Sequence, residues 1–478
     1  MRPRGSLIAP LVLILLGTLF LMKNIRPDLP LFETLVAYWP FLLIGWGVLR
    51  IGEILVDSMR GKPFPMPGVT GGEWALIILL TVVGSSIWGV QRFGHLGMQN
   101  MKIGGVEVFG EAFDYPYDAN SGKAGKTPRL VVDNQRGSVR IVGADTEEVK
   151  VSGRKSVRAL EKPEADRAHE KTPISFTVAG DRVTVQTNQD RTENSRVTSD
   201  LEITVPRGAS VEARGRYGDW DVSDIQGEIL INSDNAGVRI QNAGAAVRIN
   251  TRKSDILRII DAKGDVELKG GGRDIELENI TGQVTINGSF SGETTVRNVA
   301  KPLRFESAVT NFRVEKVPGE LSITLGNLTG ANLVGPLTLD TKSKDVRLTD
   351  VSDGVEISVD RGDIELRQNK LPLPKTSVRA RSGSIELALP SAAQFTLNAG
   401  TDRGNLTNDF SDKLKEESEH GGGKLTGALG TGPEIRLQTG RGDLTVRKVM
   451  AGDAMPPAPP KELKAPPKAP PPPRADNQ

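Results

Sequence analysis

Short apolar–polar–apolar triplets recur along the middle of the chain at a nearly constant interval of nine residues. They begin at Val211, Trp220, Ile229, Val238, Val247, Ile256, Val266, Ile275, Val284, Thr294, Leu303, Phe312 and Leu321, then, after a seven-residue step, at Leu328, Leu337, Val346, Val355 and Ile364. The alternation inside each triplet has period two, which is typical of a strand with one buried face. Nine residues allow one strand and one corner, so the pattern predicts a β-solenoid.

Alternate triplets differ in the residues that come directly after them. One set continues with Asn or Lys, as in Ile231-Asn232. The other continues, after one further residue, with a corner signature of Asn or Asp, an apolar residue, a variable residue and Gly, as in Asp224-Ile225-Gln226-Gly227. At these corners we expect Gly to adopt positive φ, Asn or Asp to bond the backbone, and the apolar residue to fill the corner. The predicted fold is therefore all-β, a single-stranded parallel β-solenoid with about 18 residues per two-strand rung.

Three apolar runs precede the solenoid, at about residues 7–22, 35–51 and 74–90. Each has nearly the length of a membrane-spanning helix, so residues 1–92 are predicted to form an α-helical transmembrane region. Arg2, Arg4 and the basic residues after the second run favour the cytoplasm. Three spans then place the solenoid outside the cytoplasm, whereas a two-span hairpin with a re-entrant second run would place it inside.

The remaining boundaries follow from composition. The predicted segments are a linker at 93–127, an N-terminal β cap at 128–210, solenoid repeats at 211–448 with a polar loop insertion at 408–432, and a disordered Pro-rich tail at 449–478. A charged segment from Ala159 to Lys171 is predicted to be a surface helix or loop. The tail either follows an envelope polymer or is simply solvated.

Composition excludes several kinds of chemistry. The chain has no cysteine, which removes disulfides, thiol nucleophiles and Cys-ligated metals, and its three histidines, His95, His169 and His420, are scattered. With 61 basic and 59 acidic residues alternating along the strands, no basic stripe for nucleic acid is present. We therefore expect no metal site, no cofactor and no nucleic-acid partner.

Recurrent aspartates provide the sharpest test of an enzymatic hypothesis. The set placed at one corner position comprises Asp265, Asp274, Asp345, Asp363 and Asp443. Repetition at a turn indicates turn chemistry, because a catalytic pair needs one special place. The two Arg-Gly-Asp tripeptides, at 361–363 and 441–443, are interpreted in the same way, and the single Gly270-Gly271-Gly272 run lacks the stacked copies of calcium-binding repeats.

Two stretches carry a family resemblance. The segment from Arg381 through Ser384-Ile385-Glu386-Leu387 to Phe410 and the ending from Gly427 to Leu444 resemble the closing motif of the bacterial putative-adhesin β-solenoid family, a family of unknown function. Together with the repeated Gly-Asp units, the resemblance spans about residues 128–448. It implies a β-solenoid and an extracytoplasmic setting, and it supplies no catalytic residues.

A shorter resemblance lies in the N-terminal region. The motifs Ile8-Ala9-Pro10-Leu11 and Trp39-Pro40-Phe41-Leu42 are similar to the hydrophobic region of bacterial envelope-stress membrane proteins. This resemblance implies a membrane anchor for the chain.

We predict a non-enzymatic, multi-pass protein of the cytoplasmic (inner) membrane, with an extracytoplasmic β-solenoid that acts as an adhesin-like or scaffold interaction module. No catalytic, cofactor-binding or metal residue is assigned. Expected partners are the lipid bilayer, a cell-wall glycan or further copies of the chain, and a membrane signalling protein. The alternative is an envelope-stress sensor that signals through its membrane spans, and a polysaccharide-active enzyme is the third hypothesis.

Overall fold

The computed structural model describes residues 102–103, 106–107, 111–159, 161–192, 196–410, 413–419 and 421–449. The chain divides into two compact units, Met1–Phe113 with Arg158–Arg167, and Asp114–Val157 with Ala168–Gln478. In the first unit, β1 (Lys102–Ile103) and β2 (Val106–Glu107) form an antiparallel pair.

The predicted membrane spans and the tail from residue 450 lie outside the described residues. Within the described part of the chain, no helix is long and apolar enough to cross a membrane.

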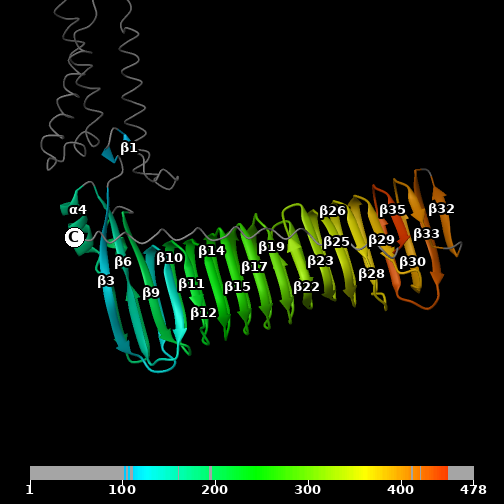
Figure 1. Cartoon of the computed structure of the whole chain (residues 1–478). Helices are drawn as coiled ribbons and strands as arrows, with labels where there is room; N and C mark the ends of the chain where they lie inside the picture. Colours follow the sequence, from blue (N-terminus) through cyan, green and yellow to red (C-terminus); the bar gives the residue numbers. More distant parts are fainter. Residues whose placement is uncertain are drawn as a thin grey trace, which may run out of the picture. The chain divides into compact units, whose positions relative to one another are not determined.

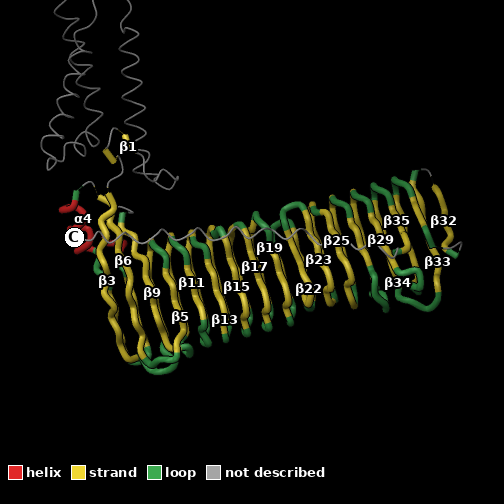
Figure 2. The backbone as a smooth tube through the Cα atoms, in the orientation of Figure 1, coloured by secondary structure: helices red, strands yellow, loops and turns green. Residues whose placement is uncertain are grey.

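The second unit is built from two long sheets whose strands follow one another in rungs (Figures 1 and 2). The strands of sheet I, in spatial order, are β7 (Ser175–Ala179), β8 (Arg182–Gln186), β4 (Arg129–Arg136), β10 (Ser210–Tyr217), β12 (Ile229–Asn235), β14 (Val247–Lys253), β16 (Val266–Gly272), β18 (Val284–Phe290), β20 (Leu303–Glu306), β21 (Thr310–Val314), β24 (Leu337–Ser343), β26 (Val355–Arg361), β28 (Thr376–Ser382), β34 (Glu434–Thr439), β30 (Phe395–Thr401), β33 (Gly422–Leu429) and β32 (Leu414–Glu419).

Sheet II runs alongside sheet I through the same rungs. Its strands, in spatial order, are β3 (Glu111–Lys123), β6 (Glu148–Ala159), β9 (Val197–Pro206), β5 (Val139–Ala144), β11 (Trp220–Ser223), β13 (Val238–Ala243), β15 (Ile256–Ala262), β17 (Asp274–Ile280), β19 (Thr294–Val299), β22 (Val317–Ile323), β23 (Asn327–Val334), β25 (Asp345–Ser352), β27 (Ile364–Arg367), β29 (Ile385–Leu389), β35 (Leu444–Lys448) and β31 (Leu406–Asn408).

As the sequence pattern predicts, alternate side chains along each strand point into the interior of the solenoid. Ile229 pairs with Val247 and Val247 with Val266, so equivalent apolar residues stack from rung to rung. The buried side chains of both sheets form one continuous hydrophobic cluster. Full burial of each such Val, Ile or Leu contributes about 1.5–3 kcal/mol, which is why no bulky globular core is needed. One position was predicted wrongly: Leu257, not Ile256, pairs with Val238 and points inward.

The corner motif works differently from the prediction. Positive φ is adopted by the polar residue, as at Asp224 (61°) and Asn279 (57°), and not by the following glycine. Gly282 is required for another reason, because a Cβ there would lie 2.1 Å from the carbonyl oxygen of Gly264 in the preceding rung. The apolar corner residue is buried as expected, with Ile280 fully enclosed. Asn and Asp also stack, since Asn242 Nδ2 donates to Asp224 Oδ1 at 2.6 Å.

The solenoid is not parallel throughout, which corrects the sequence prediction. Strands β21 and β22 form one rung that runs in the opposite direction and pairs antiparallel with its neighbours on both sides. Hairpins at residues 307–309 and 324–326 produce the two reversals. The seven-residue step from Leu321 to Leu328 marks the second hairpin, because a tight hairpin uses fewer residues than a strand and corner.

Two segments predicted as non-regular are strands. The polar insertion at 408–432 contains the antiparallel hairpin β32–β33, which ends sheet I, because Leu414 and Leu425 are buried while Lys415, Glu416 and Lys424 are exposed. The linker predicted at 93–127 contains the thirteen-residue strand β3. Its Tyr117 packs against the core, so alternate apolar contacts hold β3 in the sheet despite its polar composition.

The charged segment forms α4 (Lys162–Lys171), as one of the two predicted alternatives. In the last turn, Lys155 Nζ donates to the carbonyl oxygen of His169 at 3.1 Å and to that of Thr172. The Lys155 side chain is 2% exposed, and burial lowers its pKa to about 8.

The stability of the wild-type chain relative to a Lys155→Met variant should therefore rise between about pH 8 and about pH 10.5. In this window the unfolded chain, with an ordinary lysine pKa of about 10.4, binds more protons than the folded chain. The gain is complete above the unfolded pKa and is lost as pH falls through about 8. Thermal unfolding of both proteins across this pH range measures the difference in their stability. A difference that does not change with pH would contradict the lowered pKa of Lys155.

Candidate functional site

The recurrent aspartates serve the solenoid corners. The carboxylate of Asp265 accepts the backbone N–H of Gln283, and the other four make equivalent bonds to the next rung. Their turn role is confirmed, with one correction. Asp265 leads into sheet I at one corner, whereas Asp274, Asp345, Asp363 and Asp443 lead into sheet II at the other corner.

The two Arg-Gly-Asp tripeptides are corners as predicted. Gly362 (φ 136°) and Gly442 (φ 139°) adopt backbone conformations that favour glycine, and Asp363 and Asp443 bond the following rung. The arginines remain exposed on the same edge of the unit.

Only one of the three histidines lies in the part of the chain that the structure describes. His169 stacks on Tyr115 with ring centroids 4.1 Å apart, while His95 and His420 lie outside the described residues. In the described ranges no three His, Asp or Glu residues are grouped so as to hold a metal ion. Gly270, Gly271 and Gly272 form the end of strand β16.

At several places on the outer surface, polar side chains pair with one another across strands. Arg258 contacts Glu276 at 3.0 Å, and Asn250 Nδ2 donates to Asn232 Oδ1 at 2.8 Å. Glu212 receives hydrogen bonds from Arg129 and Arg214, and these lower the pKa of its carboxyl group. Each exposed pair contributes only about 0–1 kcal/mol, but its donors and acceptors are already engaged with each other.

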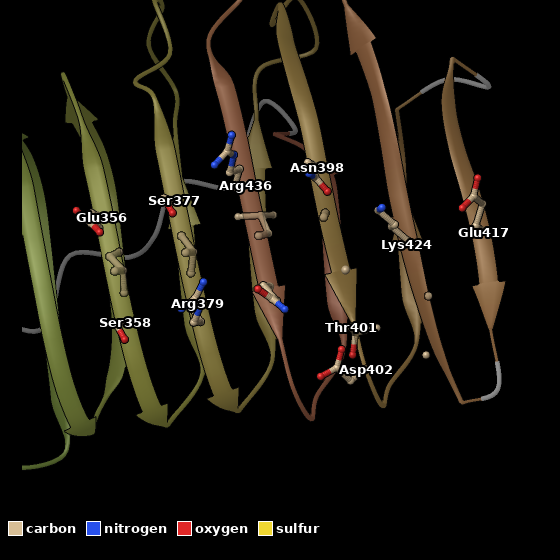
Figure 3. A pocket seen from close by; sticks show the side chains of 18 residues that line it. Glu356, Ser358, Ser377, Arg379, Asn398, Thr401, Asp402, Glu417, Lys424 and Arg436 are labelled. Atoms are coloured by element: carbon tan, nitrogen blue, oxygen red, sulfur yellow. The ribbon is translucent and has the colours of Figure 1, made fainter.

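A groove of about 1120 Å³ interrupts this pattern near the end of sheet I (Figure 3). It crosses β26, β28, β34, β30, β33 and β32, so the hairpin missed by the sequence prediction forms one of its sides. Gly400 lies in the groove, and a Cβ there would approach only the Gly423 oxygen, at 3.6 Å. The absence of a side chain at Gly400 opens the space above the strands.

The strand register arranges the groove side chains in two rows. In one row Ser377 pairs with Arg436, which pairs with Asn398. The second row is Ser358, Arg379, Gln438, Gly400, Lys424 and Glu417, each on the strand next to the last. Because side chains on one face of a strand are two residues apart, both rows face the groove.

These groove side chains are largely unpaired. Among the described residues, Arg379, Asn398 and Gln438 have no side-chain hydrogen bond, and Lys424 has no ion pair, whereas Arg436 Nε donates to Glu434 at 2.6 Å. The lining residues carry three cations, Arg379, Lys424 and Arg436, against three carboxylates. The groove therefore offers many free donors and acceptors with no net charge.

The three carboxylates, Glu356, Asp402 and Glu417, do not converge. Glu356 and Glu417 lie at opposite ends of the groove (Figure 3), five strand spacings or about 24 Å apart along the sheet. Asp402 and Glu417 are two strands apart and displaced along the strand, which corresponds to about 12 Å. An acid–base pair of a glycoside hydrolase needs about 5–9.5 Å. This arrangement suits binding along a length of polymer.

Comparison with known proteins addresses the fold and not the ligand. A search of curated proteins finds no match. Three of the solved structures that match do so at low identity: a "putative cell adhesion protein" from Clostridium sporogenes (10% identity, 70% of this chain and 100% of that chain, TM-score 0.17), a "putative adhesin" from Parabacteroides distasonis (12%, 71% and 98%, 0.20) and another from Bacteroides fragilis (12%, 71% and 97%, 0.19). At these TM-scores the matches carry no further argument.

A family model gives a firmer assignment. Residues 127–447, well over half of the 478-residue chain, match the model described as Toastrack DUF4097. This range contains the strands from β4 to β34 and nearly all of β35. The chain therefore belongs to the Toastrack DUF4097 family.

Proposed function

We propose that the chain is a membrane-anchored, extracytoplasmic, non-enzymatic scaffold or adhesin-like module that binds a neutral, hydroxyl-rich polymer of the bacterial envelope through the groove on sheet I. The observation that carries this proposal is the set of unpaired donors and acceptors that the strand register gathers in one groove, where Arg379, Gln438, Asn398 and Lys424 lie on four neighbouring strands. The predicted spans at residues 7–22, 35–51 and 74–90 supply the anchor.

The groove chemistry fits a glycan better than a charged ligand. Sugar hydroxyls donate and accept hydrogen bonds, and Asn398, Gln438, Ser358 and Ser377 offer both functions. The balance of three cations and three carboxylates gives no preference for an anion.

The groups are also spread across six strands, at intervals of about 4.8 Å. A linear polymer can therefore engage several rows at once, and individually weak contacts add up through multivalency. Binding of this kind holds a surface without needing a reactive centre.

A Ser377→Trp variant should lose at least about tenfold in affinity for the insoluble glycan fraction of the envelope, because the indole fills the groove. The matched control is Thr285→Trp, on the same face and in the same pairing row but outside the groove. Co-sedimentation of the full chain with isolated envelope polymer measures the affinity. Equal binding by wild type and both variants would contradict the proposal.

A further inference from the structure

A second hollow, of about 730 Å³, lies on the edge of the solenoid where strands β24, β26, β28 and β34 of sheet I turn toward sheet II. Its lining contains four cationic side chains, Lys342, Arg361, Arg381 and Arg441, and one carboxylate, Asp360. We call this set of five residues the basic edge. It lies apart from the residues that line the groove on sheet I.

The strand register spaces these cations regularly. Arg361 pairs with Ser382, and the backbone N–H of Gly383 donates to the Arg441 carbonyl oxygen at 2.7 Å, so three successive strands carry Arg361, Ser382 and Arg441 at the same level. Two strand spacings correspond to about 9–10 Å. The two arginines of the Arg-Gly-Asp tripeptides are 80 residues apart in sequence. In the structure they therefore lie in one row, on the same edge of the solenoid and two strands apart.

Most of this positive charge is not neutralised by direct pairing. Arg381 contacts Asp360 at 3.3 Å, but in the described part of the chain Lys342, Arg361 and Arg441 form no ion pair. The neighbouring carboxylates of Asp345, Asp363 and Asp443 reduce the local potential. However, each of these three carboxylates already accepts a hydrogen bond from a backbone N–H of the neighbouring rung. The donor to Asp443 is the backbone N–H of Asn405. The guanidinium groups of Arg361 and Arg441 keep their donors free for a ligand.

We propose that the basic edge binds a linear polyanion that carries phosphate or carboxylate groups at regular intervals. Guanidinium groups recognise both kinds of oxyanion through paired hydrogen bonds, and Ser343 and Ser382 add hydroxyl donors between them. A single exposed ion pair is worth little, so the spacing of several cations supplies the affinity. This site is independent of the neutral groove, and either proposal can fail alone.

The test compares two double variants of the full chain, kept in mild detergent, that remove the same charge. Arg361→Gln/Arg441→Gln changes the basic edge, whereas Arg252→Gln/Arg273→Gln removes two exposed arginines from the same side of earlier rungs, outside the hollow. Inorganic polyphosphate and polygalacturonate serve as phosphate and carboxylate probes, and neutral dextran is the reference. Surface-immobilised protein at several salt concentrations gives the affinities.

We expect wild type to bind one or both polyanions and not dextran, with affinity that falls as salt rises. The Arg361→Gln/Arg441→Gln variant should lose about tenfold or more and show a shallower salt dependence, while the control loses less than about twofold. The preferred probe identifies the oxyanion. Equal losses in the two double variants, or no binding of either probe by wild type, would overturn the proposal.

Discussion

Replacing Gly362 by alanine should lower the free energy of unfolding by about 3 kcal/mol or more. Gly362 has φ 136°, and a Cβ there would lie 2.0 Å from the Lys344 carbonyl oxygen in the adjacent rung. That oxygen belongs to the backbone and cannot rotate away. The strands must therefore separate or the corner must change its conformation, and both options break the register between β24 and β26.

The matched control lies at the other end of the same strand. Gly354 precedes β26 without a positive φ, and a Cβ there would meet only the Pro336 side chain at 4.0 Å. Gly354→Ala should change stability by less than about 1 kcal/mol. Thermal unfolding and hydrogen exchange of β26 and β27 measure both variants. Similar stability of the two alanine variants would contradict the close-contact account of these corners.

A Phe312→Ala variant should lose about 3–5 kcal/mol, because the ring is fully buried in the rung that runs in the opposite direction. Phe312 pairs with Phe305 on one side and Leu339 on the other, so its removal leaves a cavity between the two parallel halves of the solenoid. In stacked repeats each rung depends mainly on its neighbours. The loss of hydrogen-exchange protection should therefore centre on β20, β21 and β24.

Asn311→Ala is the control for this prediction, since Asn311 is exposed on the same strand and its loss should cost less than about 0.5 kcal/mol. Strand β13, many rungs away, reports on the range of the effect. If Phe312→Ala lowered protection in β13 as much as in β21, the rungs would unfold as one unit and the local account would be wrong.

The alternation of apolar residues was sufficient to predict the two-strand rung, because burial of Val266 and Leu268 is required whichever neighbour they pair with. It could not predict strand direction. Phe312 and Val314 alternate identically in a parallel and an antiparallel strand, and only the short step at Leu321 marked the irregularity.

The groove was missed because it depends on the β32–β33 hairpin. Dense charge between Leu414 and Leu425 obscured their alternation, and only pairing with β30 shows that these two leucines face the core. The basic edge was missed for a related reason. Arg361 and Arg441 were recognised as exposed corner residues, but their alignment depends on β34 pairing next to β28, which sequence order does not indicate.

The most direct test of the account uses the absence of cysteine from the chain. Ser377→Cys, in the groove, and Thr285→Cys, outside it, each provide one thiol for a small, membrane-impermeant, photoactivatable maleimide applied to intact cells. We expect both positions to be labelled and only the label at residue 377 to form an adduct with envelope glycan on illumination. Labelling of both only after lysis, equal glycan adducts from both, or an adduct with a single membrane protein would contradict the account, and the last result would favour a sensor.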